Sequence, residues 1–233
     1  MDTSDQEVEE GPKPKRLLFA VRGTRLLIGV LALAIVATSV VWTAIHLRAP
    51  AQPSVAPEDQ VVSYSTNTPD ETKPGASYDW LGRPNDPKKI KIASIGVDAY
   101  LQKVGVDQDR NVTVPNNVHL GGWFVDSVRP GEKGLSIIDG HYDGRTQSEA
   151  IFKDLAKVKD GDIIVIEFGD GRTKAFAVSG VTTTTIKDAP SVLFSQDPQA
   201  TNQLNLITCG GTYDRQGRTY DKRVIVSAQL QQG

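Results

Sequence analysis

One cysteine, one histidine and one arginine lie at the ends of apolar runs, and their types fit a thiol-dependent acyl transfer. Cys209 ends the apolar run in "LITCGG", His141 follows "GLSIIDG", and Arg223 opens "RVIVSAQL". A thiol needs a lowered pKa or a nearby base to attack a carbonyl at neutral pH. A histidine can supply that base, and an arginine can stabilise the oxyanion because it stays charged.

Other residues compete for each of these roles. A free cysteine is usually a small buried hydrophobe, so Cys209 could be structural. His119 in "VPNNVHLGGW" is a second candidate base, and Arg215 and Arg218 are further candidate arginines. We prefer Arg223, because two adjacent antiparallel strands would bring the start of the last strand across from Cys209.

Composition excludes several other classes of protein. The chain has 233 residues and a net charge of −2, which does not suggest nucleic-acid binding. With a single cysteine it cannot form an internal disulfide or a thiolate metal cluster. The three histidines are far apart in the sequence (His46, His119, His141). We therefore expect neither a metal nor a cofactor.

The first third of the chain predicts a membrane anchor followed by a tether. Residues 26–47 contain no Asp, Glu, Lys or Arg, and about 20 apolar residues are enough to span a bilayer. Basic residues precede the span, so residues 1–25 should be a cytoplasmic tail and the rest should lie outside the cell. A cleaved signal peptide is the alternative. Residues 48–87 hold seven of the 13 prolines and are typical of an extended tether, within which "YDWLG" (78–82) could dock on the following domain.

Residues 88–233 have the pattern of a domain made mainly of β-strands. Short runs such as "KKIKIASIGV", "LQKVGV", "NVTVP", "GLSIID", "DIIVIEF", "TKAFAVSGVTTTT" and "QLNLITC" are typical of strands. Residues 146–161 predict one helix, because Thr146 and Glu149 have capping-box spacing and an apolar stripe follows them. Many short strands with few helices favour a closed barrel or a sandwich.

Four segments in order resemble the sortases, the membrane-anchored cysteine transpeptidases of Gram-positive cell envelopes. These are "VPNNVHLGGWFVDSVRPGEKG", "GLSIIDGHYDGR" with "AIFKDLAKVKDGDIIVI", "LNLITC", and "YDKRVIVSA". The resemblance runs from about residue 88 to 230. The short loops and "TCGGTYD" look most like the class F group. Asp139 departs from the pattern, since the family usually has a small apolar residue there.

The resemblance implies a fold, a reaction and a set of site residues. The fold would be a closed eight-stranded β-barrel with one or two short helices. Cys209, His141 and Arg223 would be catalytic. The residues expected to bind substrate are Thr208, Val192, Leu193 and Phe194, the last three from the loop 182–200.

The reaction implied is the cleavage of a C-terminal sorting signal like Leu-Pro-x-Thr-Gly. The acyl group would pass through a thioester to an amine of a peptidoglycan precursor or of another protein. The partners would be surface proteins that bear such a signal, with the membrane contacted through residues 26–47. Two other functions stay open: an anchored β-rich binding module with a structural cysteine, and a thiol hydrolase that releases its product to water.

Overall fold

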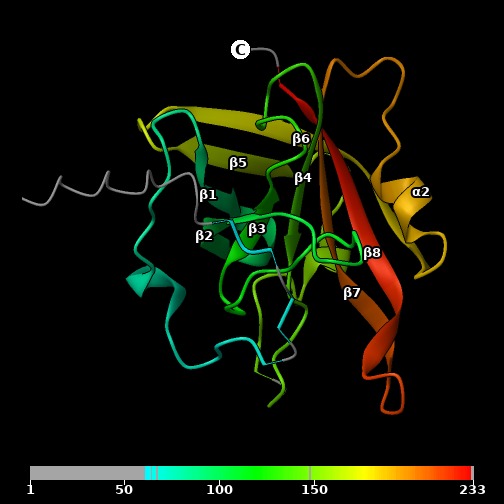
Figure 1. Cartoon of the computed structure of the whole chain (residues 1–233). Helices are drawn as coiled ribbons and strands as arrows, with labels where there is room; N and C mark the ends of the chain where they lie inside the picture. The colour runs from blue at the N-terminus through cyan, green and yellow to red at the C-terminus, as the bar shows by residue number, and fades with distance from the viewer. Residues whose placement is uncertain (1–60, 64, 67, 147, 232–233) are drawn as a thin grey trace, which may run out of the picture. The chain divides into compact units, whose positions relative to one another are not determined.

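Eight strands close into a barrel in the computed structural model of this chain, which describes residues 61–63, 65–66, 68–146 and 148–231 (Figure 1). The closed order is β1-β2-β3-β4-β7-β8-β6-β5. In chain order the strands are β1 (Pro87–Ile92), β2 (Val97–Val104), β3 (Gly121–Phe124), β4 (Gly134–Gly140), β5 (Ile163–Phe168), β6 (Thr173–Thr185), β7 (Asn202–Asp214) and β8 (Thr219–Leu230). The prediction of a mainly-β closed barrel of eight strands is confirmed.

Two of the strand pairs are parallel and decide where the functional residues meet. β2 pairs with β3 and β4 pairs with β7 in parallel, while the other neighbouring strands are antiparallel. Parallel neighbours run in the same direction, so the carboxyl ends of β4 and β7 lie at the same edge of the barrel. β8 returns beside β7, and its first residues therefore lie next to the last residues of β7.

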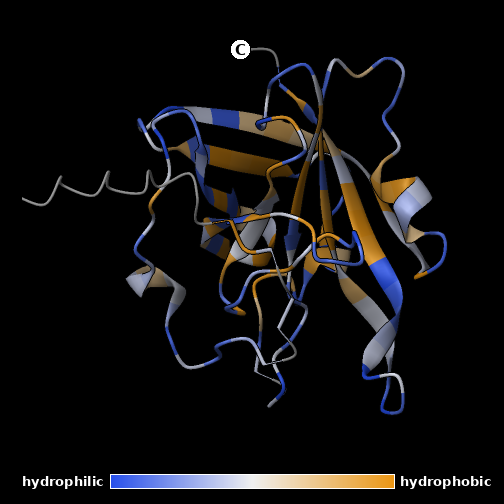
Figure 2. Ribbon diagram, in the orientation of Figure 1, coloured by the Kyte–Doolittle hydropathy of each residue, from blue (hydrophilic) through white to orange (hydrophobic). Residues whose placement is uncertain are grey.

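Along each strand, successive side chains alternate between the barrel interior and its outer face. An outer apolar cluster covers part of that face and consists of Val62, Val104, Phe124, Ile137, Ala189, Leu193 and Ile225. On β7, Leu204 and Leu206 fill the interior, while Ile207 packs with the outer cluster. On β8, Val224 and Val226 point inward and Ile225 outward. Figure 2 shows β8 changing from orange to blue towards its N-terminal end, where it leaves the apolar part of the sheet.

In the part of the chain that the structure describes, helices are few and short. The α-helix α2 (Ala189–Leu193) lies in the connection between β6 and β7, and 3₁₀ turns occupy η2 (Gly75–Ser77), η3 (Ala93–Ile95) and η4 (Leu155–Lys157). None of the helices within the described residues is long and apolar enough to cross a membrane. The predicted cytoplasmic tail and anchor, residues 1–47, lie outside the described residues.

The predicted helix over residues 146–161 is wrong. Its described residues, 146 and 148–161, form turns, an isolated bridge at Glu149 and the 3₁₀ turn η4. Its apolar residues are buried as the pattern suggested, with Phe152 and Leu155 fully enclosed in the barrel core. Thr146 does not cap a helix, because its backbone N–H and hydroxyl both donate to the carboxylate of Glu71. Tertiary contacts thus override a local helix signal.

Two smaller features also differ from the sequence interpretation. The segment "NVTVP" forms no strand and contributes one isolated bridge, between Val112 and Val106. Conversely, β3 was not predicted, because "GGWF" has two glycines and no alternation of polar and apolar residues.

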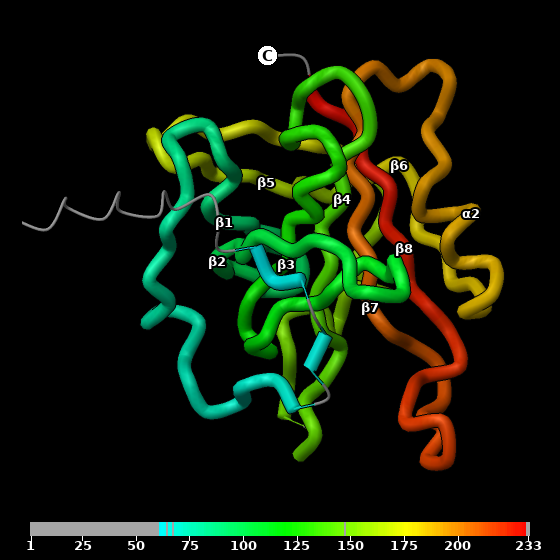
Figure 3. Tube along the Cα trace, viewed as in Figure 1, coloured from blue at the N-terminus to red at the C-terminus, as the bar shows by residue number. Residues whose placement is uncertain are grey.

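The described part of the segment predicted as a tether runs along the outside of the barrel (Figure 3). Val62 is buried and pairs with Val104 of β2. Tyr78 packs against Tyr100, with ring centroids 6.1 Å apart. Trp80 lies beside Gly169, where an added Cβ would come within 2.5 Å of its ring. Residues of the "YDWLG" stretch are therefore in contact with the barrel, although Leu81 remains exposed.

Candidate active site on the outer face of three adjacent strands

Cys209 on β7 and Arg223 on β8 lie side by side, and His141 directly follows β4, the strand on the other side of β7. Cys209 and Arg223 are direct partners in the antiparallel β7–β8 pair. The last parallel pair between β4 and β7 joins Asp139 to Ile207, so continuing that register by two residues brings His141 beside Cys209. The hydroxyl of Thr208 donates to the carbonyl of Gly140 at 2.8 Å and ties the two strands together at this point.

The two glycines after Cys209 form a bulge in β7. The pairing with β8 shifts register between Gly210 and Tyr213. Gly211 has a φ of 82°, a backbone conformation that side chains with a Cβ rarely adopt. The backbone N–H of Thr212 then donates to the carboxylate of Asp221 on β8 at 2.7 Å. A bulge bends its strand and increases the local twist, so the hairpin changes course immediately after the cysteine.

The imidazole of His141 is oriented by a backbone carbonyl. Its Nε2 lies 2.7 Å from the carbonyl oxygen of Pro115. A carbonyl can only accept, so Nε2 carries the proton and Nδ1 is the nitrogen left to exchange one. Burial lowers the pKa of His141, while the bond to Pro115 and the charge of Asp143 act in the opposite direction.

The thiol of Cys209 is half-buried on the same outer face. Burial raises its pKa above the ordinary value, the charge of Arg223 lowers it in part, and Asp143 and Asp139 act with burial. Together with the lowered pKa of His141, this favours a neutral thiol beside a neutral imidazole at neutral pH. The nucleophilic thiolate is then a minor species before a substrate enters.

The guanidinium of Arg223 is fixed by its own strand. Its Nη1 donates to the carbonyls of Tyr220 at 3.0 Å and of Lys222 at 2.8 Å, and its Nη2 lies 3.4 Å from the hydroxyl of Thr219. These contacts use three of the five N–H donors of an arginine. The competing arginines, Arg215 and Arg218, lie exposed in the turn between β7 and β8, away from the Cys209 register.

Sequence reasoning missed a second pair of residues at this site. The hydroxyl of Tyr220 donates to the carboxylate of Asp143 and joins β8 to the loop after His141. Burial, and next the bond to Asp143, raise the pKa of Tyr220, so its hydroxyl remains a donor. The ring of Tyr220 packs edge-on against Tyr142 and Tyr213, with centroids 5.0 and 5.2 Å away. The only available sequence signal was the closeness of Asp143 to His141 and of Tyr220 to Arg223.

Asp139, which departs from the pattern the resemblance suggested, is buried without a partner. It is 5% exposed, and neither carboxylate oxygen has a hydrogen-bond partner among the described residues. Burial raises its pKa well above the ordinary value, so the fold favours the protonated form of this side chain. It sits over Gly122 of β3, where an added Cβ would collide with its Oδ1.

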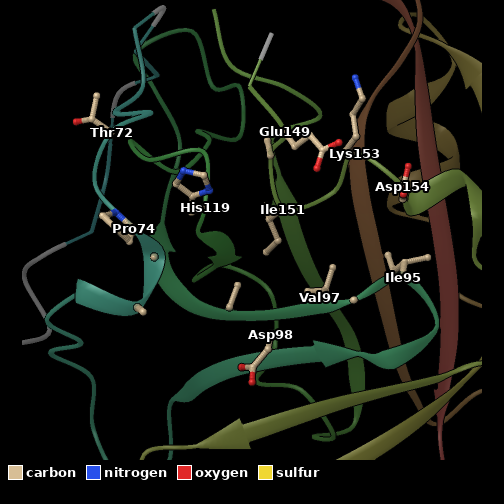
Figure 4. A pocket seen from close by; sticks show the side chains of 15 residues that line it. Thr72, Pro74, Ile95, Val97, Asp98, His119, Glu149, Ile151, Lys153 and Asp154 are labelled. Atoms are coloured by element: carbon tan, nitrogen blue, oxygen red, sulfur yellow. The ribbon is translucent and has the colours of Figure 1, made fainter. Parts of the chain in front are cut away.

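His119, the competing base, lies elsewhere. Its Nε2 is 3.3 Å from the carbonyl of Glu71. It lines a cleft of about 650 Å³ whose wall includes neither Cys209 nor Arg223. In Figure 4 the ring of His119 lies between Thr72 and Pro74 on one side and Glu149 on the other.

The connection between β6 and β7 is pinned against β7. Asn205 donates to the carbonyl of Leu193 at 2.7 Å, and Gln203 donates to that of Ser195 at 3.0 Å. Of the residues predicted to bind substrate, Leu193 is 6% exposed and packs in the outer apolar cluster, with Val192 partly buried against it. Phe194 is 51% exposed. Thr208 is buried and bonded to β4, as described above.

No group of three or more His, Cys, Asp or Glu side chains in the described ranges is arranged to hold a metal ion. The row of thiol, imidazole and guanidinium can perform acyl transfer through the protein's own side chains.

Comparisons with known proteins place this arrangement in a family. Residues 90–231, more than half of the chain, match the family model described as "Sortase domain". No protein of curated function matches the chain. Among solved structures, similar ones include a lid mutant of sortase A from Corynebacterium diphtheriae, with 24% identity, TM-score 0.49 and coverage of 65% of this chain and 73% of that one. A Clostridium perfringens sortase D5 transpeptidase is 24% identical, with a TM-score of 0.47 and coverage of 63% of this chain and 79% of that one. Clostridium perfringens sortase C with the C-terminal cell wall sorting motif is 19% identical, with a TM-score of 0.46 and coverage of 68% of this chain and 80% of that one.

Proposed function

This chain belongs to the sortase family of cysteine transpeptidases, and we propose that it cleaves a Leu-Pro-x-Thr-Gly-like sorting signal through a thioester on Cys209. The observation that carries the proposal is the row of His141, Cys209 and Arg223 across three adjacent strands. Paired strands hold Cys209 and Arg223, and His141 directly follows a third strand. Acyl transfer depends on that kind of preorganisation.

In the proposed first step, the Sγ of Cys209 attacks the carbonyl carbon of the threonine in the signal. The thiol proton passes to His141, a C–S bond forms, and Arg223 stabilises the oxyanion. The C–N bond then breaks, and the imidazolium returns the proton to the departing amine. In the second step an acceptor amine attacks the thioester and loses a proton to His141, the C–S bond breaks, and the departing thiolate takes that proton from the imidazolium. Nδ1 of His141 exchanges the proton in both steps, because Nε2 is bonded to Pro115.

The apolar part of the signal is proposed to bind beside the connection between β6 and β7. Phe194 offers exposed apolar surface there, and its neighbours Val192 and Leu193 pack in the outer apolar cluster. The hydrogen bonds of Asn205 and Gln203 keep this wall in place. Within the family we propose a class F type, on the basis of "TCGGTYD" and the short connections.

Residues 26–47 are proposed to anchor the protein in the membrane of a Gram-positive cell. The basic residues before this segment favour a cytoplasmic N-terminus and an extracellular barrel. In that location the enzyme would meet surface proteins carrying a C-terminal sorting signal and an amine of the cell envelope.

The decisive experiment follows the thioester and its fate. The full chain in detergent is incubated with a small library of sorting-signal peptides, and the acylated protein is sought by mass spectrometry. Cys209→Ala and Cys209→Ser should form no thioester, because a hydroxyl is much harder to ionise than a thiol. Both variants should melt within a few degrees of the wild type.

Product analysis separates the proposal from its alternatives. With an added amine, the proposal expects an amide product that replaces the hydrolysed peptide. Hydrolysis alone would indicate a thiol hydrolase. An absence of any acylated wild-type protein, together with a loss of several kcal/mol in Cys209→Ala on the scale of a core truncation, would indicate a binding module with a structural cysteine.

A further inference from the structure

Glu71, which precedes the barrel in sequence, is hydrogen-bonded to the loop that follows His141. Its carboxylate accepts from the backbone N–H of Arg145 and of Thr146, the latter at 3.2 Å. It also accepts from the hydroxyls of Thr146 and Ser148, the latter at 3.1 Å. The hydroxyl of Thr146 is the main cause of a lowered pKa for Glu71. The side chain is therefore ionised at neutral pH and makes charge-assisted bonds, which are about twice as strong as neutral ones.

The residues around Glu71 also hold the chain on the other side of His141. The backbone N–H of Asp70 donates to the carbonyl of Asn116 at 2.8 Å, and that of Val118 donates to the carbonyl of Asp70 at 3.1 Å. The side chain of Asn117 donates to the carbonyl of Lys73 at 3.1 Å. These bonds fix the stretch that begins immediately after Pro115, whose carbonyl orients the imidazole of His141.

The loop has little regular structure of its own to keep it in place. Its backbone contributes an isolated bridge between Asp143 and Glu149, a hydrogen bond from Gly144 to Ser148 at 3.0 Å, and one from Phe152 to His141 at 3.0 Å. Turns with few buried contacts open at low free-energy cost. Four bonds to one carboxylate from a distant part of the chain are a substantial addition to that stability.

We propose that Glu71 is a positioning residue for His141: by holding Arg145, Thr146 and Ser148 while its neighbours hold Asn116 and Val118, it keeps the imidazole in its place beside Cys209. The kinetic test of this proposal rests on the proposed function, because it measures peptide cleavage. The hydrogen bonds of the Glu71 carboxylate go to the loop and not to the catalytic row, so it acts through the loop. A misplacement of about 1 Å in a catalytic group can cost about 10²-fold in rate.

The central test is Glu71→Gln in the full chain in detergent micelles. The amide keeps the shape and loses the charge. Oε1 accepts from Arg145 and Oε2 from Thr146 and Ser148, so in either orientation the NH₂ group faces at least one group that is itself a donor. We expect kcat for peptide cleavage to fall by about 10- to 100-fold, with little change in KM, because the wall between β6 and β7 is untouched. An increase in KM with kcat unchanged would contradict a role in positioning the base.

A spectroscopic readout tests the same idea without turnover. Burial holds the pKa of His141 below its ordinary value of 6.5. Loosening the loop lets water reach the ring, so the pKa of His141 should rise towards that value in Glu71→Gln. It can be followed by NMR of histidine-labelled protein, with the other two histidines assigned by His46→Gln and His119→Gln.

Matched variants separate this effect from general destabilisation. Asp79→Asn removes one negative charge from the same segment, and within the described residues Asp79 forms no hydrogen bond to the loop, so this variant should behave as wild type. Thr146→Val and Ser148→Ala each remove one donor to Glu71 and should give smaller effects in the same direction. Combining Thr146→Val with Glu71→Gln should cost less than the sum of the two, because both break the same bond.

Two results would overturn the proposal. One is an unchanged kcat and an unchanged His141 pKa in a folded Glu71→Gln protein. The other is a loss of rate in Glu71→Gln that parallels its loss of thermal stability, while Thr146→Val and Ser148→Ala remain fully active. Because the pKa measurement needs no substrate, it decides the role of Glu71 even if the peptide library yields no thioester.

Discussion

At the scale of single residues, the guanidinium of Arg223 has a charge and a shape whose effects can be separated. Its charge lowers the pKa of Cys209, whereas its planar fork suits an oxyanion. Arg223→Gln should therefore shift the alkylation of Cys209 by iodoacetamide to higher pH. Arg223→Lys keeps a charge and should shift it less.

The fork should matter for turnover regardless of charge. Both Arg223→Lys and Arg223→Gln should lose about 10²–10³-fold in kcat, as expected when an oxyanion donor is removed. Arg215→Ala and Arg218→Ala, which change exposed residues of the turn, should keep near-wild-type kcat. If one of these two were inactive and Arg223→Gln active, the assignment of the arginine would be wrong.

Asp139 should make the stability of the protein depend on pH. Its pKa in the folded state lies well above the ordinary 3.8, so folding takes up a proton at pH values between the two. Its contribution to stability is present below pH 3.8 and is lost progressively as the pH rises towards the folded value, at about 1.4 kcal/mol for each pH unit in that window.

Asp139→Asn is nearly isosteric and cannot ionise, so it should remove this dependence. Urea unfolding at pH 4, 6 and 8 should show the variant gaining on the wild type as the pH rises. Asp139→Ala should show the same trend. Parallel stability curves for wild type and Asp139→Asn would mean that the carboxyl is not held neutral in the fold.

At the scale of the element, the bulge in β7 depends on Gly211. Its φ of 82° disfavours any residue with a Cβ, and that atom would collide with the carboxylate of Asp221. Gly211→Ala should lower the free energy of unfolding by about 1–3 kcal/mol. It should also reduce turnover, because the bulge sets the path of the hairpin that carries Arg223.

Gly180→Ala is the control for this experiment. Gly180 lies on β6, and a Cβ there would meet no atom within 4 Å. Its effect on stability should stay within about 0.5 kcal/mol, as for most surface substitutions. Equal losses in the two alanine variants would argue that backbone strain at Gly211 is not the cause.

The sequence predicted those features that depend on neighbours along the chain. The pairing of Cys209 with Arg223 follows from one hairpin, and the strands β5 and β6 from another. The predicted helix over 146–161 failed because Thr146 finds its partner in Glu71, some 75 residues earlier, and no local pattern records that contact. The orientation of His141 by Pro115 could not be predicted for the same reason, because a hydrogen bond to a backbone carbonyl does not depend on which residue supplies it.

At the scale of the whole molecule, the proposed anchor predicts a definite topology. With residues 1–25 inside the cell and the barrel outside, protease added to wall-stripped cells should digest the barrel and leave the N-terminal tail intact. Epitope tags at each end, detected by immunoblotting, would follow both parts. A barrel that resists protease until the cells are lysed would contradict the anchor, and loss of residues 1–47 from the mature protein would indicate a cleaved signal peptide.

The orienting partners of the imidazole and the guanidinium are largely main-chain carbonyls, at Pro115, Tyr220 and Lys222. Every amino acid supplies such an oxygen, so these contacts place no demand on which side chains occupy those positions. The chain can therefore accumulate substitutions at Lys222 while the path of the backbone is kept. Substitutions at Lys222 could therefore change the surface beside the site, and with it the acceptor specificity, while the contact that orients Arg223 is kept.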